Sequence, residues 1–419
     1  MKIQLHFRRR LALEDIRFYI CALCVLSYAL LEHMSIGIPW FSGMKMPLLY
    51  IAGLCALPEI NLILKKFRIR KYFYVTCVTI VLCGFLFLSA YMNKAPRFGV
   101  VPYRNTYRLI LYIAELLILT FWVSEKGWFH RILQLTFGYV LLIVLVVDVM
   151  IFADIDLLGM KENDIYIIGT KFSVVYMHMN LLSLWLVRMQ DQLTFSGWQR
   201  ARLIAGGMAA LIVTFRVNCM SGVLGCVMLL LLLLWRTQHG KRLTRKLLCS
   251  PRMLLLFAVA SVLFVFVVQV LISIPAVSYF IESVLGRNNN LTGRVQIYEM
   301  FSGKMQGHWL FGFGMGNANA AAMALFGYAN AQNAILQWVL QTGMLVTVLL
   351  VALIVLVFDR LYKNQNLQKM MPMVALIYVY ITLGTVETTF SMSFILWVFM
   401  LLMYVNQPPH ILAQEHKKR

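Results

Sequence analysis

The residues best suited to chemistry lie in one polar, glycine-rich stretch between Leu291 and Gly343. It contains the sequences TGR at 292–294, WLFGFG at 309–314 and QN at 332–333. Arg294 begins a helical pattern of apolar residues, so its side chain should lie in the first turn of a helix. Free backbone N–H groups and the helix dipole favour an anion there, and a guanidinium matches phosphate oxygens. The stretch therefore indicates a site for an anionic substrate.

Few titratable groups in or near this stretch could transfer a proton. His308 is the best placed within it, and Glu387, which follows a later apolar run, is second. Glu32 and His33 are further candidates, at the end of the first apolar run. Gly312 and Gly314 would let the backbone approach a ligand closely, although aromatic neighbours could equally pack this loop against a bilayer.

Basic residues gather in a second, shorter loop. Positive residues on the translocated side of a membrane oppose the usual orientation bias. Their presence in this loop therefore indicates a functional role. Binding an anionic ligand and binding lipid phosphates are both consistent with this pattern. These residues are Lys94, Arg97, Arg104 and Arg108, and a further candidate, Arg287, shortly precedes the polar stretch.

Composition indicates what must position these residues. The chain of 419 residues is 61% hydrophobic and only 13% charged, whereas globular domains are about 25% charged. Apolar runs of membrane-spanning length recur throughout, which predicts an all-α polytopic membrane protein. About twelve spans are expected, at 16–35, 46–64, 72–92, 107–123, 132–153, 172–188, 202–217, 219–235, 253–274, 334–358, 371–387 and 391–406.

The basic residues orient these spans. With the N-terminus in the cytoplasm, most of the 38 lysines and arginines fall in cytoplasmic loops, as the positive-inside rule requires. The net charge of +21 therefore does not indicate nucleic acid. The apolar run 203–235 is too long for one crossing, so we expect two short helices in a tight hairpin that places Arg216 at the outer face.

Three regions follow from this topology. Residues 1–274 form a bundle of about nine spans, and residues 275–333 form one long extracytoplasmic loop with short helices. Residues 334–419 contain three further spans and a cytoplasmic tail. The chain lacks related halves and broken helices at corresponding positions, which argues against a secondary transporter.

The order of elements over residues 291–343 resembles that of the bacterial O-antigen polymerase and ligase family. The resemblance rests on TGR at 292–294, WLFGFG at 309–314, a polar helix start with asparagine, and the late Gly343. Family members carry a His-Asn pair where this chain has Gln332-Asn333, and glutamine cannot act as a base.

This resemblance implies a metal-independent glycosyltransferase that works on undecaprenyl-diphosphate-linked saccharides at the outer leaflet. Arg216 and Arg294, joined by Arg104 or Arg108, would stabilise the leaving pyrophosphate, and Gln332 would align the acceptor hydroxyl. His308 or Glu387 would serve as a base if one is needed. The expected substrate-binding residues are Arg97, Arg104, Arg108, Arg287, Gly312, Gly314 and Asn333.

The leading hypothesis is a polymerase that joins lipid-linked repeat units into O-antigen lipopolysaccharide, capsule or exopolysaccharide. Its expected partners are a lipid-linked donor and acceptor, the lipid bilayer and a chain-length regulator protein, with no cofactor, metal or nucleic acid. The expected location is the bacterial inner membrane, with the active-site loop on the periplasmic or extracellular side. The alternatives are an O-antigen ligase, which moves the polymer to a terminal acceptor, and a lipid-linked oligosaccharide flippase.

Overall fold

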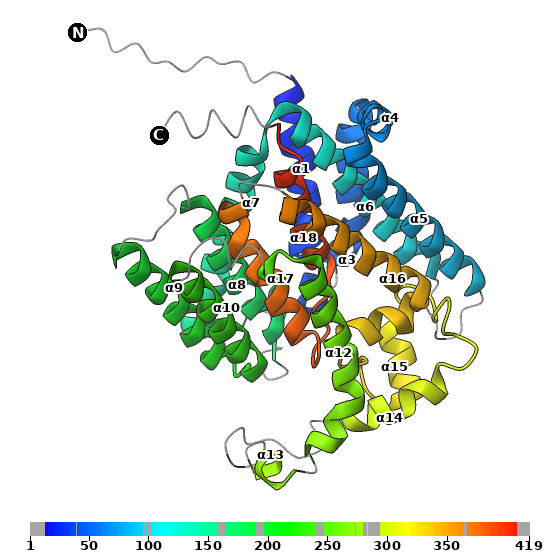
Figure 1. Cartoon of the computed structure of the whole chain (residues 1–419), viewed down its shortest axis with the longest axis vertical. Coiled ribbons are helices and arrows are strands. Elements are labelled where there is room, and N and C mark those ends of the chain that lie inside the picture. The colour runs from blue at the N-terminus through cyan, green and yellow to red at the C-terminus, as the bar shows by residue number, and fades with distance from the viewer. Residues whose placement is uncertain are drawn as a thin grey trace.

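A computed structural model of the chain shows an almost entirely helical protein (Figure 1). It describes residues 13–38, 40–94, 98, 102–156, 164–189, 197–238, 247–272, 274–279, 283, 294–363 and 367–408. The first half contains α1 (Leu13–Leu30), α2 (Met34–Gly37), α3 (Phe41–Ala56), α4 (Asn61–Phe67), α5 (Arg70–Met92), α6 (Pro102–Lys126), α7 (Phe129–Phe152), α8 (Lys171–Met189) and α9 (Gly197–Arg216). The second half contains α10 (Met220–Gln238), α12 (Pro251–Ile272), α13 (Pro275–Tyr279), α14 (Arg294–Lys304), α15 (Ala318–Phe326), α16 (Ala334–Lys363), α17 (Met371–Leu383) and α18 (Met392–Val405). A two-residue hairpin pairs β1 (Ile165–Tyr166) with β2 (Gly169–Thr170).

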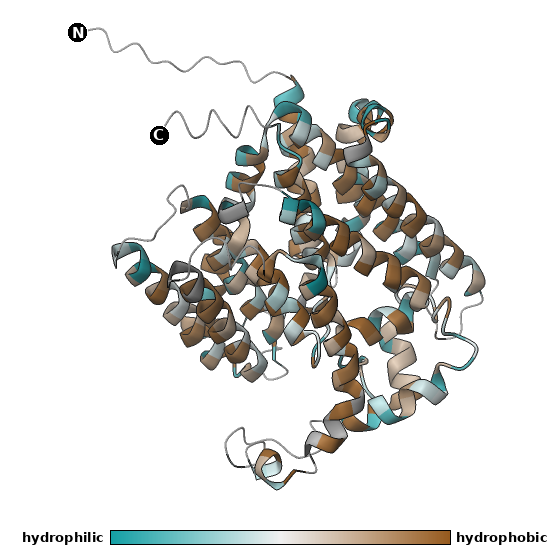
Figure 2. Ribbon diagram, viewed as in Figure 1, coloured by the Kyte–Doolittle hydropathy of each residue, from teal (hydrophilic) through white to brown (hydrophobic). Residues whose placement is uncertain are grey.

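The long helices have the character of membrane spans. Five helical segments of the described chain are long and apolar enough to cross a bilayer, and shorter apolar helices accompany them. Those five segments are Phe41–Glu59, Tyr72–Met92, Pro102–Lys126, Phe129–Phe152 and Ala334–Lys363. Hydrophobic residues dominate the helices between the two ends of the molecule (Figure 2). The protein is therefore an all-α protein built to lie in a membrane.

Each of the twelve ranges predicted as spans overlaps a helix, although 16–35 runs from α1 into α2 and 46–64 from α3 into α4. The predicted hairpin within 203–235 is confirmed, because α9 ends at Arg216 and α10 begins at Met220. Asn218 closes the turn between them in the left-handed region, with φ 50°. Asparagine tolerates this conformation better than most residues do.

Helices α17 and α18 form the centre of the bundle (Figure 1). Every residue of α18 except Ser393 is buried, and α17 is buried along almost its whole length. A helix that is hydrophobic all round must be surrounded by other helices or by lipid. The segment that joins α17 to α18 is consequently held between other elements, and it carries Glu387.

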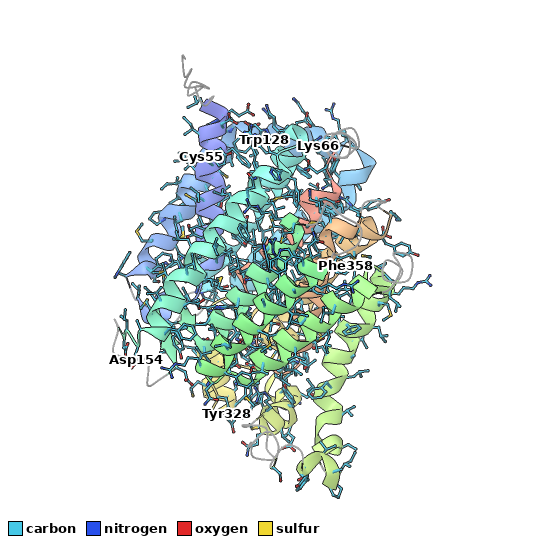
Figure 3. All side chains as sticks on the ribbon, turned by 90° about the vertical axis from the view of Figure 1, so that its left-hand side faces the viewer. Cys55, Lys66, Trp128, Asp154, Tyr328 and Phe358 are labelled. Atoms are coloured by element: carbon cyan, nitrogen blue, oxygen red, sulfur yellow. The ribbon has the colours of Figure 1, made fainter. Side chains whose placement is uncertain are left out.

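Described residues from four of the segments between the long helices lie at two opposite ends of the molecule. Figure 3 shows Lys66 and Trp128 at one end and Asp154 and Tyr328 at the other. At the first end, cations of the expected cytoplasmic loops pair with carboxylates. These pairs are Arg17–Glu59, Lys66–Glu125, Lys126–Glu14 and Arg131–Asp15. The opposite end, which carries α14 and α15, contains the candidate site.

Candidate functional site

A polar cavity of about 700 Å³ lies at the end of the bundle that carries α14 and α15. Carboxamides, hydroxyls and aromatic rings are all present along its walls. Its lining includes Tyr28, Glu32, His33, Ser42, Lys45, Asn105, Arg108, Thr170, Phe172, Ser173, Tyr176, Asn319, Asn330, Gln337, Trp338, Gln341, Glu387, Thr388, Phe390 and Ser391. Ligand pockets combine apolar and aromatic walls with a few placed polar groups, and this cavity has that character.

Glu387 lines this cavity, and its carboxyl group forms an ion pair with Arg294. Arg294 Nη2 lies 2.9 Å from Glu387 Oε1, and Arg294 Nε donates to the Val386 carbonyl at 2.9 Å. The two side chains are only 16% and 11% exposed. A guanidinium that binds both a carboxylate and the neighbouring backbone orients that carboxylate firmly. The sequence predicted both residues as site members but not their contact.

Helix α14 positions Arg294 as its first residue, as the helical pattern predicted. Ile297, Tyr298 and Phe301 form the buried face of this short helix. The Tyr298 hydroxyl lies 2.9 Å from the Gln332 carbonyl and 3.1 Å from that of Thr385. This contact ties α14 to the segment that carries Glu387.

Burial raises the pKa of the Glu387 carboxyl above its ordinary value, because desolvation disfavours the charged form. The charge and hydrogen bond of Arg294, the Ser221 hydroxyl and the more distant charge of Lys171 act in the opposite direction. Glu387 is thus a buried carboxyl that faces a cavity and keeps cationic support. These are the surroundings expected of a general base.

Arg216 lies at the same end of the molecule but outside the cavity lining. It is exposed at the end of α9, near Tyr166. Burial raises the pKa of the Tyr166 hydroxyl, and the positive charge of Arg216 opposes this rise. The hydroxyl of Ser221, in the first turn of α10, lies close enough to Glu387 to lower the pKa of its carboxyl group. The start of α10 therefore contributes to the site through Ser221, whereas Arg216 is not among the residues that line the cavity.

The glycine run has a packing role that the sequence did not reveal. Gly312 and Gly343 both have positive φ, at 61° and 84°, and their backbones lie against each other. A Cβ atom on Gly312 would lie 2.7 Å from the amide nitrogen of Gly343. Gly314, also at positive φ, packs against the side chain of Pro102 at the start of α6. Neither Gly312 nor Gly314 lines the cavity.

These glycines let the loop repair a break in α16. The helix has a non-helical residue at Gly343, so backbone groups there lose their partners within the helix. The loop replaces them: Phe313 N donates to the Leu340 carbonyl at 2.8 Å, and Met344 N donates to the Trp309 carbonyl at 2.8 Å. Non-helical backbone at membrane depth requires such compensation.

Three other predicted residues lie beside the cavity but do not line it. Asn333 is buried and caps α16, since its Oδ1 accepts from the backbone N–H groups of Ile335 and Leu336 at 3.0 Å. Gln332 adopts positive φ, 52°, in the turn before it. The ring of His308 is stacked on Phe313, with centroids 4.1 Å apart.

The structure describes only some of the predicted basic residues, and these differ in whether they line the cavity. Arg108 lines the cavity and is 8% exposed, whereas Arg104, one turn earlier on α6, is exposed. Glu32 and His33 also line the cavity. Arg97 and Arg287 lie outside the described residues.

The sequence analysis did not predict Lys45 or the carboxamide side chains that line the cavity. Gln337 and Gln341 recur four residues apart at the start of α16, with Trp338 between them on the same wall. Polar residues at helical spacing inside an apolar run were a signal that could have found them. Lys45, Asn105, Asn319 and Asn330 carried no comparable signal, because they come from separate elements.

The fold and this cavity define an α-helical membrane protein with a charged, polar chamber at one end of its helix bundle. Comparison with models of known protein families and with functionally curated proteins finds no match for this chain.

Proposed function

We propose that this protein is a polymerase of lipid-linked saccharides. It would transfer a growing glycan from its undecaprenyl diphosphate onto the next lipid-linked repeat unit. The observation that carries the proposal is the cavity, in which a buried carboxyl group, several carboxamides and several aromatic rings line the same space. Carboxamides can donate to and accept from sugar hydroxyls, and aromatic rings pack against the apolar faces of sugars.

The reaction needs no reagent beyond the two substrates. The acceptor hydroxyl oxygen attacks the anomeric carbon of the donor, and the bond from that carbon to the diphosphate oxygen breaks. The electron pair of that bond leaves with the diphosphate, and the hydroxyl proton passes to Glu387. Arg294 acts as a positioning residue that orients Glu387, which is supported by their 2.9 Å contact. Arginines at this end of the molecule, Arg216 among them, would compensate the charge of the leaving diphosphate.

The topology that accompanies this function has twelve crossings, with the cavity opening on the periplasmic side of a bacterial inner membrane. One observation and one requirement of the reaction support this arrangement. The loops richest in basic residues were predicted to be cytoplasmic, and those that the structure describes lie at the end opposite the cavity. Enzymes that use lipid-linked sugars also need a site at the membrane boundary, where the lipid tail can remain in the bilayer.

Purified full-length protein and a synthetic lipid-diphosphate oligosaccharide test this proposal. We expect products of increasing length, with the same yield in EDTA, and a loss of at least a hundredfold in Glu387→Gln. In cells, Arg294→Ala and Arg216→Ala should leave surface saccharides at one repeat unit while the protein remains in the membrane. Full-length polymer in both variants would refute the assigned roles. Transfer to a terminal acceptor without chain growth would identify a ligase, and transport without transfer would identify a flippase.

A further inference from the structure

Arg108 is a buried cation whose hydrogen-bonding capacity the protein leaves largely unused. Its side chain lines the cavity, yet only 8% of the residue is exposed. Nε is buried and has no hydrogen-bond partner. Nη1 reaches Asn105 Oδ1 and Nη2 reaches the Ser42 carbonyl, both at 3.4 Å, which is long for such bonds.

The other charges of the cavity have partners within the protein. Glu387 pairs with Arg294. Lys45 Nζ donates to the Glu32 carbonyl at 2.7 Å, and the Glu32 carboxylate accepts from the backbone N–H of Met392 at 2.7 Å. Arg108 forms no ion pair with any carboxylate in the described part of the chain. Among the described cations that line the cavity, Arg108 therefore has neither an ion pair nor a hydrogen bond shorter than 3.4 Å.

A buried guanidinium with weak contacts is unfavourable unless a charged partner joins it. The surrounding elements nevertheless hold it in place. Arg108 follows the first turn of α6, and Gly316 lies so close to Asn105 that a Cβ atom there would clash with the Asn105 side chain. The loop that contains Gly316 thus packs against Asn105, the residue whose Oδ1 accepts from Arg108 Nη1.

We propose that Arg108, supported by Lys45, forms an oxyanion subsite on the α3–α6 wall of the cavity, separate from the Arg294–Glu387 pair. Its ligand is an oxyanion carried by the saccharide substrate, and this identification of the ligand rests on the proposed function. Two sources share that chemistry: the diphosphate of the carrier lipid and the carboxylate of a uronic acid in the repeat unit. A planar guanidinium fork can bind either one through two parallel hydrogen bonds.

The experiment measures binding and requires no turnover. The full-length protein in nanodiscs is titrated with farnesyl diphosphate in one arm and with a glucuronate-containing oligosaccharide in the other, next to its neutral glucose analogue. The variants are Arg108→Gln, Arg108→Lys and the control Lys304→Gln, which removes an exposed cation from α14 near the same end. Melting without ligand shows whether each variant folds.

We expect Arg108→Gln to weaken binding of one charged probe at least tenfold, Arg108→Lys to weaken it less, and Lys304→Gln to leave it unchanged. Dependence in the diphosphate arm identifies the carrier lipid, and dependence in the uronate arm identifies an acidic repeat unit. Equal affinity of folded Arg108→Gln and wild type for both probes would overturn the subsite. If Arg108→Gln does not fold, Arg108→Lys with wild-type affinity would overturn it, as would a wild-type protein that binds neither probe.

This result is independent of the polymerase assay. Arg108-dependent binding by a protein that does not lengthen glycans would retain the subsite and refute the proposed function. Glycan lengthening by a protein whose binding of both probes does not depend on Arg108 would support the proposed function and refute the subsite.

Discussion

Replacement of Arg294 by alanine separates two roles that an arginine at this position could have. If Arg294 orients and supports Glu387, its loss leaves a buried carboxylate without its strongest partner. Breaking a buried pair in this way costs about 3–5 kcal/mol, and one pKa unit corresponds to about 1.36 kcal/mol. The two side chains are only 16% and 11% exposed, so solvent compensates little of this loss. The charged form of Glu387 should become harder to reach.

The sign of the pH effect follows directly. A general base must be deprotonated, so activity falls as the pH drops through the pKa of Glu387. Burial already raises that pKa, and Arg294 opposes the rise. Without Arg294 the pKa should rise further, and the acid limb of the pH–rate profile should move to higher pH. The Ser221 and Lys171 contributions remain in the variant and limit the change.

The assay is product formation by purified protein across a pH series, with product length recorded. Arg294→Lys should show a smaller displacement because it keeps a positive charge, and Lys304→Ala on the same helix should show none. A large loss of rate in Arg294→Ala with an unchanged acid limb would contradict the positioning role. That outcome would indicate that Arg294 contacts the diphosphate itself.

Three further predictions concern the residues beside the cavity. Gly343→Ala and Gly312→Ala place a Cβ atom on facing backbones at positive φ, so each should lower the stability of the membrane-inserted protein by about 2 kcal/mol or more, measured as melting temperature. Gly84→Ala, where no atom lies within 4 Å of the new methyl group, should not. Asn333→Ala removes the cap of α16 and should destabilise the protein by about 1 kcal/mol with turnover retained in the folded fraction; loss of turnover at unchanged stability would refute this. Gln332→Ala should reduce turnover less than Arg294→Ala, because its side chain lies outside the cavity lining, and an equal loss would show that it contacts substrate.

The helices were predictable because their cause is local. Apolar runs of the required length must satisfy their backbone groups within the segment, and a helix is the way a single segment does so. The hairpin at Arg216 and the helix start at Arg294 followed from the same reasoning, since span length and apolar spacing are properties of short windows. The sequence also indicated Arg294, Glu387 and Arg108 as candidate functional residues, because charged residues near apolar spans are energetically unfavourable without a role.

Which of these residues meet is a different matter, and only the tertiary structure decided it. Arg294 and Glu387 are 93 positions apart, and their contact depends on how α14 packs against the segment after α17. The sequence suggested that the glycines approach a ligand, but in the structure they bring the loop against the break in α16. Local composition does not show which distant backbone segment a glycine will contact. The cavity draws its walls from α3, α6, α8, α15, α16 and the α17–α18 junction. A sequence window reports the chemistry of each wall, but the space between the walls exists only once distant helices have packed together.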